Sequence, residues 1–193
     1  IFLDQHEVRD GLVNGLALGK SVLNMFSYTA AFSVAAAMGG AVETTSVDLA
    51  KRSRELSTAH FEANGFSMGN HRLVVMDVFD YFKYAKKKGL SYDLIVIDPP
   101  SFARNKKRTF SANKDYHKLI AQSLDILSEH GTIIASTNAA NMTVQQFKKQ
   151  LRKGLGDVSA DFVNLQQLPA DFTVNPNDPT SNYLKVYTIK VNK

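Results

Sequence analysis

The chain of 193 residues contains no cysteine. This absence excludes disulfide bridges, thiolate metal ligands and a cysteine nucleophile from the sequence. Its five histidines are scattered without the spacing of metal ligands, so we expect no metal site. The sequence also has no apolar run of about 18 residues and no opening signal pattern. We therefore expect a cytoplasmic protein that does not bind membranes.

Glycine is missing from one informative place, residues 24–38, which include and follow the first predicted strand of the main domain. Dinucleotide cofactors need glycines in the turn after that strand, because the backbone must approach their phosphates closely. The sequence therefore disfavours a nicotinamide cofactor.

The residues that are present suit one well-packed domain. Hydrophobic residues make up 44% of the chain, and a chain of this length can bury a sizeable core. The sequence begins at Ile1 without an initiator methionine. We interpret residues 1–20, which open as a short strand, as a lead-in outside the core that remains from an upstream region, and we assign residues 21–193 to the main domain.

Strand-like and helical patterns alternate through that domain. Strands are predicted at residues 22–26, 42–47, 73–76, 94–97 and 132–136, and helices at 30–38, 49–64, 79–88, 113–129 and 143–154. In the second helix, the apolar spacing predicts a buried face at Leu49, Leu56, Ala59 and Ala63. Two last strands, 162–165 and 184–191, have no helix between them and can pair antiparallel. The pattern predicts a doubly wound α/β fold with a seven-stranded, mostly parallel sheet and an antiparallel last strand.

Three predicted strands end in acids, Asp48, Asp77 and Asp98. One such aspartate is usually a helix cap, and Asp98 with Pro99 and Pro100 is equally consistent with an ordinary stiff turn. However, the carboxyl ends of parallel strands meet at one edge, where doubly wound sheets bind ligands. Asp48 also lies about 20 residues beyond the first turn, the distance at which an acid accepts from ribose hydroxyls. Together the acids predict a nucleoside-binding crevice.

S-adenosylmethionine is a nucleoside cofactor without a phosphate, so it agrees with both the acids and the missing glycines. Its amino-acid end is expected to meet Ser27, Thr29 and the N-terminus of the following helix, where backbone N–H groups suit a carboxylate.

The chain is moderately basic, with a net charge of +5 and a pI near 9.3, which permits a polyanionic partner. Lysine and arginine gather in three clusters. Those within residues 83–88 and 148–153 are expected on helices, as solvated faces. The third follows the Asp98 turn, and we expect it to hold phosphates at the mouth of the site; it consists of Arg104, Lys106, Lys107 and Arg108.

Several motifs in a fixed order resemble those of bacterial 23S ribosomal RNA methyltransferases of the RlmI and RlmK type. They are residues 22–33 (VLNMFSYTAAFS), 44–49 (TTSVDL), 98–102 (DPPSF) and 131–136 (GTIIAS), with residues 2–5 (FLDQ), Arg9 and residues 183–185 (YLK). The resemblance covers essentially the whole chain. It implies a class I methyltransferase fold, S-adenosylmethionine as cofactor, and 23S ribosomal RNA or the large ribosomal subunit as partner. Family members usually carry an RNA-binding domain and a linking subdomain upstream.

The resemblance also implies residue roles. The cofactor would be held by Asn24, Phe26, Ser27 and Tyr28 at its methionine end, by Asp48 at its ribose, and by Asp77 and Val78 at its adenine. Three more residues are expected in the cofactor site: Thr29, Leu49 and Asp98. Asp98 and Pro99, with Pro100 and Phe102, would meet the target base. Asn138 resembles an asparagine of the branch that methylates guanine N7.

Two departures from the family pattern affect the prediction. Ala30 stands where the family has glycine, and an alanine costs on the order of 1 kcal/mol if that position needs a positive φ. Members that methylate cytosine C5 carry a cysteine near positions 136–138, and this chain has none. Because that carbon needs a thiolate adduct, we expect a target with its own lone pair, such as a ring nitrogen or an exocyclic amine.

The sequence therefore predicts methyl transfer from S-adenosylmethionine to a base of ribosomal RNA. We expect Phe102 to stack on the base while Asp98 and the Pro99 carbonyl accept from its edge; Phe102 as an ordinary loop anchor is the alternative. Other possible functions are a weak or inactive RNA-binding module, a methyltransferase for a small molecule or protein, and, last, a nicotinamide oxidoreductase.

Overall fold

A seven-stranded sheet forms the centre of the computed structural model, which describes residues 2–104 and 109–193. The strand order is β3-β2-β1-β4-β7-β9-β8, and only β9 runs antiparallel to its neighbours. This confirms the predicted fold class and the reversed last strand. The strands are β1 (Ser21–Met25), β2 (Glu43–Asp48), β3 (His71–Val75), β4 (Tyr92–Ile97), β7 (Leu127–Thr137), β8 (Ser159–Gln166) and β9 (Lys185–Asn192).

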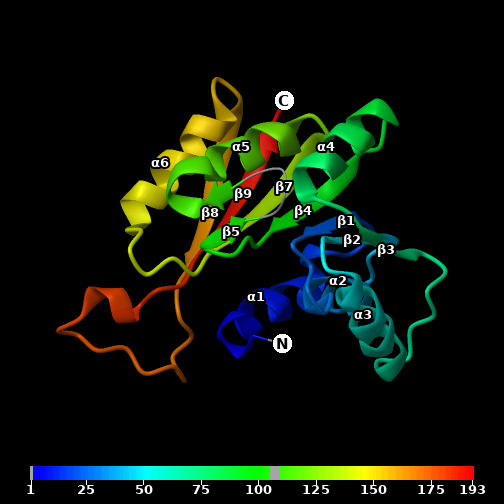
Figure 1. Ribbon diagram of the computed structural model, residues 1–193, viewed down its shortest axis with the longest axis horizontal. Helices are drawn as coiled ribbons and strands as arrows, with labels where there is room; N and C mark the ends of the chain where they lie inside the picture. The colour runs from blue at the N-terminus through cyan, green and yellow to red at the C-terminus, as the bar shows by residue number, and fades with distance from the viewer. Residues whose placement is uncertain (1, 105–108) are drawn as a thin grey trace.

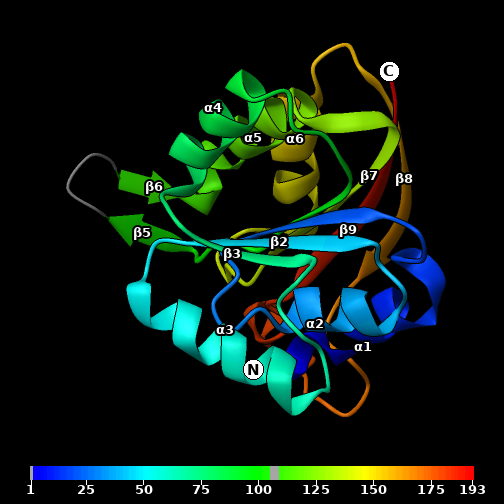
Figure 2. The same cartoon turned by 90° about the vertical axis from the view of Figure 1, so that its right-hand side faces the viewer.

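Helices cover both faces of the sheet, as Figures 1 and 2 show. One face carries α4 (Val78–Lys87), α5 (Ala112–Leu124) and α6 (Val144–Leu155), and the other carries α1 (His6–Gly11), α2 (Ala31–Met38) and α3 (Lys51–Ala63). Residue patterns did not predict a short hairpin of β5 (Phe102–Arg104) and β6 (Thr109–Ser111), which projects beside the main sheet (Figure 2). Among the described residues, no helix is long and apolar enough to cross a bilayer.

The central strands are apolar without alternation because both of their faces are buried. In β4, Ile95 and Ile97 pack into the core beneath α4 and α5. Leu94 and Val96 point the other way and pack with Leu12 and other residues on the α1 and α2 side. Each central strand therefore contributes to two cores, and its carboxyl end is fixed from both sides.

The N-terminal segment differs from the prediction. Its opening residues form a 3-10 turn, η1 (Leu3–Gln5), followed by α1 and a kinked turn, η2 (Leu12–Leu16), instead of a strand. Val8, Leu12 and Ala17 are buried against the sheet. The expectation that this segment stays outside the core was wrong, because its apolar residues face the sheet at helical spacing.

The predicted inward face of α3 was also wrong. Leu49 and Leu56 are 54% and 38% exposed, whereas Ser53, Ser57 and Phe61 form the buried side. The two serines donate to Asp48 and to the Tyr28 carbonyl, so hydrogen bonds to the site select this face.

The last two helices end at other residues than predicted. Helix α5 stops at Leu124, and Leu127 already belongs to β7. The predicted capping box of α6 is present, with Thr143 and Gln146 exchanging backbone and side-chain hydrogen bonds. Gly154 does not end α6 but packs against α5, where a side chain would meet Ile120.

Candidate active site

A cavity of about 540 Å³ opens at the carboxyl edge of the parallel strands. This volume lies within the range of about 300–1,000 Å³ that is usual for small-molecule sites. Its wall includes the acids at the carboxyl ends of three parallel strands: Asp48 at the end of β2, Asp77 after β3 and Asp98 after β4. The structure thus brings the three predicted acids together around one space.

The turn after β1 has an unusual backbone that shapes one side of the cavity. Phe26, Tyr28 and Ala30 all have positive φ, at 60°, 46° and 58°. The Tyr28 N–H of this turn donates to the Asp48 carboxylate over 3.0 Å. Ala30 therefore has the positive φ that the glycine of the family pattern indicated, and this conformation is strained for an alanine.

Asp48 joins this turn to the start of α3. Its other carboxylate oxygen accepts from the Ala50 N–H at 2.8 Å and from the Ser53 hydroxyl at 3.0 Å. These donors fix the orientation of a half-buried carboxylate that lines the cavity. Such a carboxylate can accept further hydrogen bonds from the hydroxyls of a ligand.

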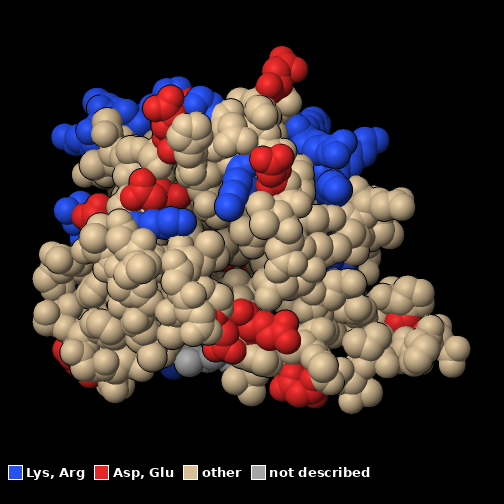
Figure 3. All heavy atoms as spheres, turned by 180° about the vertical axis from the view of Figure 1, so that it is seen from behind, with Lys and Arg blue, Asp and Glu red and all other residues tan. Residues whose placement is uncertain are grey.

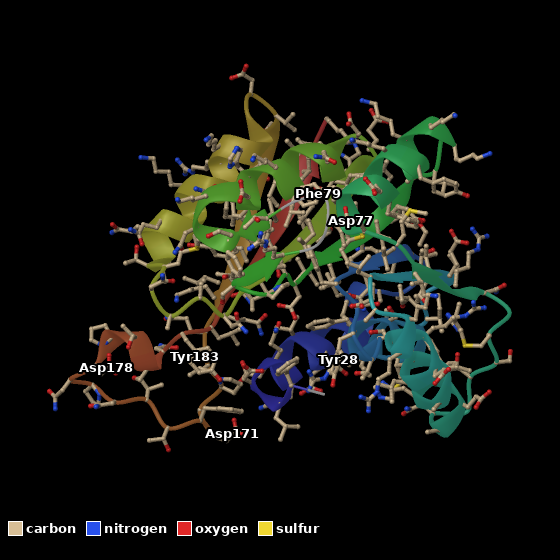
Figure 4. All side chains as sticks on the ribbon, in the orientation of Figure 1. Tyr28, Asp77, Phe79, Asp171, Asp178 and Tyr183 are labelled. Carbon is tan, nitrogen blue, oxygen red and sulfur yellow. The ribbon has the colours of Figure 1, made fainter. Side chains whose placement is uncertain are left out.

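Asp77 has a structural role and also lines the cavity. It caps α4 by accepting from the Phe79 and Asp80 N–H groups at 3.0 and 3.3 Å. The cap holds Val78 and Phe79 at the cavity. Figure 4 shows Asp77 and Phe79 at the start of α4, and Tyr28 by the N-terminal helix.

Asp98 is held by hydrogen bonds from two other segments of the chain. One of its oxygens accepts from Gln5 Nε2 at 3.1 Å, and the other accepts from the Ser136 hydroxyl. Burial raises the pKa of Asp98; these two donors oppose the shift and the Asp4 charge adds to it. The buried Tyr116 hydroxyl donates to the carbonyls of Ile97 and Ser136, so the ends of β4 and β7 are locked together beside it.

The double-proline turn continues the wall. Pro99 is buried and Pro100 is exposed, and both line the cavity. Asn138, after β7, also lines it and accepts from the Ser101 hydroxyl at 2.8 Å. This hydrogen bond ties the predicted target-side residues from two strands into one surface.

Most of the predicted site residues line the cavity. Those that do are Phe26, Ser27, Tyr28, Thr29, Asp48, Leu49, Asp77, Val78, Asp98, Pro99, Pro100, Arg104 and Asn138. Asn24 instead lies fully buried beneath the turn and donates to Ser33 at 3.0 Å. Phe102 is 62% exposed on β5 and is not part of the wall. Lys106, Lys107 and Arg108 lie outside the described residues.

The N-terminal segment supplies a part of the wall that residue patterns did not predict. Phe2, Asp4, Gln5 and Arg9 all line the cavity. Their motif contributed to the family resemblance, but no role was inferred from it. Aromatic residues from the helices and the hairpin, among them Phe32, Phe79 and Phe110, complete the apolar lining.

The composition of the wall fits a nucleoside with a charged tail. Carboxylates at the ends of β2 and β3 suit hydroxyl and amine donors, and the apolar Leu49, Val78 and Phe79 beside them suit a planar base. Within the described ranges, no cluster of three histidine or acidic side chains has the arrangement of a metal site. The residues present therefore fit S-adenosylmethionine, the predicted cofactor.

Comparison with known proteins supports this assignment. The sequence model of a family described as S-adenosylmethionine-dependent methyltransferase matches residues 1–185. YwbD of Bacillus subtilis, named as a ribosomal RNA large subunit methyltransferase, is 47% identical, over 98% of this chain and 48% of its own length. Ribosomal RNA large subunit methyltransferase K of Neisseria meningitidis is 35% identical, over 89% of this chain and 47% of its own length.

A solved structure gives the same result. The crystal structure of SMU.776, described as a methyltransferase complexed with SAH, is 72% identical and superposes with a TM-score of 0.96, over 99% of this chain and 50% of that one. The chain thus spans about half the length of these relatives. The family match over residues 1–185, with the fold and cavity described above, shows that this chain belongs to the S-adenosylmethionine-dependent methyltransferases.

Proposed function

We propose that the chain catalyses methyl transfer from S-adenosylmethionine to a base of large-subunit ribosomal RNA in the cytoplasm. The observation that carries the proposal is the cavity in which Asp48, Asp77 and Asp98 converge at one sheet edge. The names of the relatives YwbD and methyltransferase K support the choice of ribosomal RNA as substrate.

The cofactor supplies an activated methyl group on a sulfonium, so the main task of the protein is alignment. Positioning of two reactants can account for roughly 7 to 11 kcal/mol of a barrier. In this proposal Asp48 accepts from the ribose hydroxyls, and Asp77 with Val78 contacts the adenine. The turn of residues 26–30, held by Asp48 and packed on the core, fixes the depth of the cofactor in the cavity.

The target base is proposed to leave its stack and enter beside the double-proline turn. Asp98 and the Pro99 carbonyl accept hydrogen bonds from its edge, which orients an attacking nitrogen lone pair toward the methyl group. The exposed Phe102 ring on the hairpin is available to stack on the base or its neighbour. Because Ser136 and Gln5 hold the Asp98 carboxylate, its orientation does not depend on the substrate.

Phosphates that flank the base are proposed to bind the basic cluster after Phe102, of which Arg104 is exposed at the cavity wall. The other two clusters lie on exposed surface of α4 and α6, as predicted. Figure 3 shows lysine and arginine gathered along the upper part of the rear face, and no lysine lines the described cavity.

A radiolabel assay tests the proposed function. The wild-type chain is incubated with tritiated S-adenosylmethionine and separate RNA, protein and metabolite fractions, and label is expected in 23S ribosomal RNA. Asp98→Ala is expected to abolish incorporation while the circular dichroism spectrum stays native. Label only in protein or metabolite would reject the RNA substrate, and wild-type turnover of Asp98→Ala would remove Asp98 from the mechanism.

A further inference from the structure

Helix α6 carries a dense set of cations on its solvent side. Lys149, Arg152 and Lys153 are exposed and Lys148 is half-buried, and the helix contains no acidic residue. Arg152 and Lys153 lie in the last turn, where positive charge interacts favourably with the helix dipole. Lys148 and Lys149 lie in the middle of the helix, and each has a like charge four residues later, an arrangement that destabilises a helix. The stability of α6 itself therefore does not explain these two lysines.

The cations of α6 have no acidic partner. Within residues 2–104 and 109–193, no salt bridge joins an acid to any of the four. An aromatic ring instead holds two of them: Lys148 Nζ lies 5.0 Å from the centroid of the Phe162 ring, and Arg152 Cζ lies 5.8 Å from it. A ring orients a cation without cancelling its charge, so both side chains remain open to an anion.

The basic cluster on α4 has different surroundings. Asp80 lies in the first turn of α4, and Lys86 forms a salt bridge with Asp125 at 3.0 Å. Lys86 and Lys87 lie in the last turn of α4, where the helix dipole favours positive charge. Figure 3 shows the α4 and α6 clusters as separate basic areas at the top of the rear face. The α4 cations are thus partly compensated by acids, whereas those of α6 are not.

Helix α6 starts next to the cavity. Asn138 lies in the cavity wall, and residues 139–143 link it to the first turn of α6. The buried Lys185 fixes this link, because its Nζ donates to the Ala139 carbonyl at 3.1 Å. Lys148 follows about 6 Å along the axis from the first residue of α6. An RNA strand that leaves the cavity beside Asn138 therefore meets the cations of α6 within a short distance.

A further cation lies between the β5–β6 hairpin and α6. Lys114, in the first turn of α5, is exposed and forms no salt bridge with any acid that the structure describes. The carbonyl of its neighbour Asn113 accepts from Gln150 Nε2 of α6 at 2.8 Å, so this turn lies against α6. Helix α5 begins directly after β6, which pairs with β5 and its Arg104. Positive charge therefore continues from Arg104 at the cavity wall, past Lys114, to α6.

We propose that Lys114 and the cations of α6 form a contact surface outside the cavity, which binds phosphates of the RNA strand that flanks the target base. The inference rests on the proposed function and names the surface that holds that substrate. RNA is the partner that fits, because its backbone offers a regular series of anions to cations that have no acidic partner in the protein. These residues act on RNA binding and take no part in methyl transfer itself.

Filter binding of radiolabelled 23S ribosomal RNA at several salt concentrations tests the proposal. The triple variant Lys149→Gln/Arg152→Gln/Lys153→Gln removes three charges from α6. It should reduce the slope of log K against log salt concentration by about 2–3, since each phosphate contact contributes roughly 0.7–0.9 to that slope. Lys114→Gln should reduce the slope by about 1.

The triple variant Lys83→Gln/Lys87→Gln/Lys88→Gln is the matched control, because it removes three exposed charges from the α4 cluster and keeps the salt bridge of Lys86. It should change the slope by less than about 0.5. Equal losses in the two triple variants would show a general effect of net charge and overturn the proposal, as would an unchanged slope in the α6 variant. If the α6 variant does not fold, Lys114→Gln decides, and an unchanged slope in it overturns the proposal.

Kinetics with tritiated S-adenosylmethionine separate this surface from the proposed function. The α6 variant should raise KM for RNA at least about 10-fold and keep kcat and the affinity for S-adenosylhomocysteine within about 2-fold of wild type. A lower kcat with an unchanged KM would overturn the proposal. Binding of RNA that depends on α6, without label in the RNA, would support the surface and reject RNA methylation. Labelled RNA whose binding does not depend on α6 would support RNA methylation and reject the surface.

Discussion

The positive φ of Ala30 gives a stability prediction that can be measured against a matched site. Ala30 has φ 58° and ψ 28°, and its side chain is fully buried against Val34, Ala37 and Phe61. Ala36 lies in the regular part of α2 and is equally buried. We compare Ala30→Gly with Ala36→Gly, because both remove one buried methyl group.

The expected magnitudes follow from three contributions. Each substitution loses about 0.8 kcal/mol of methyl burial, and glycine in an ordered backbone costs roughly 0.5–1 kcal/mol more than alanine. Ala36→Gly should therefore reduce the free energy of unfolding by about 1.5–2 kcal/mol. Ala30→Gly also releases left-handed strain of roughly 1–2 kcal/mol, so its net effect should lie within about 1 kcal/mol of zero.

Urea unfolding followed by circular dichroism measures both changes. The account predicts that Ala30→Gly is more stable than Ala36→Gly by about 1–2 kcal/mol, with equal slopes against urea. If the two variants lose the same stability, Ala30 stores no backbone strain and the reasoning about this turn is refuted.

Three further changes test other parts of the account. Because burial raises the pKa of Asp98 above 3.8, its ionisation costs stability as the pH rises from the unfolded value toward the folded one. The unfolding free energy of Asp98→Asn relative to wild type should therefore rise as the pH increases above about 4, and a difference that does not change with pH would contradict this. Gly154→Ala should lower the free energy of unfolding by roughly 1–3 kcal/mol, because its Cβ would lie 2.5 Å from Ile120 Cβ. Gly11→Ala, which has open space around it, should raise the free energy of unfolding by roughly 0.5–1 kcal/mol. Equal melting temperatures of the two variants would count against the packing of α6 on α5. Neutralising the basic cluster should weaken RNA binding and flatten its salt dependence, and an unchanged salt slope would leave that cluster as ordinary surface; its residues are Arg104, Lys106, Lys107 and Arg108.

The sequence predicted the sheet and the convergence of acids because these depend on local and periodic signals. The unbroken apolar run of β4 identifies a strand buried on both faces, and parallel pairing then brings Asp48, Asp77 and Asp98 to one edge. The capping box at Thr143 is likewise contained in four residues. Such features do not depend on contacts between distant segments.

The errors occurred where distant contacts decide the structure. The opposite face of α3 is buried because Ser53 and Ser57 donate to the turn after β1, which apolar spacing does not reveal. Gln5 enters the site through a hydrogen bond to Asp98, 93 residues away. Phe102 lies outside the cavity wall because it belongs to the β5–β6 hairpin, which residue patterns did not predict.

A crystal structure of the chain with S-adenosylhomocysteine tests the central claim most directly. The account predicts the adenosine between Asp48 and Asp77, and the amino-acid end against Ser27 and Thr29 with the sulfur facing the turn after Asp98. A ligand bound elsewhere, or in the reverse direction with its adenine at Asp98, would contradict it.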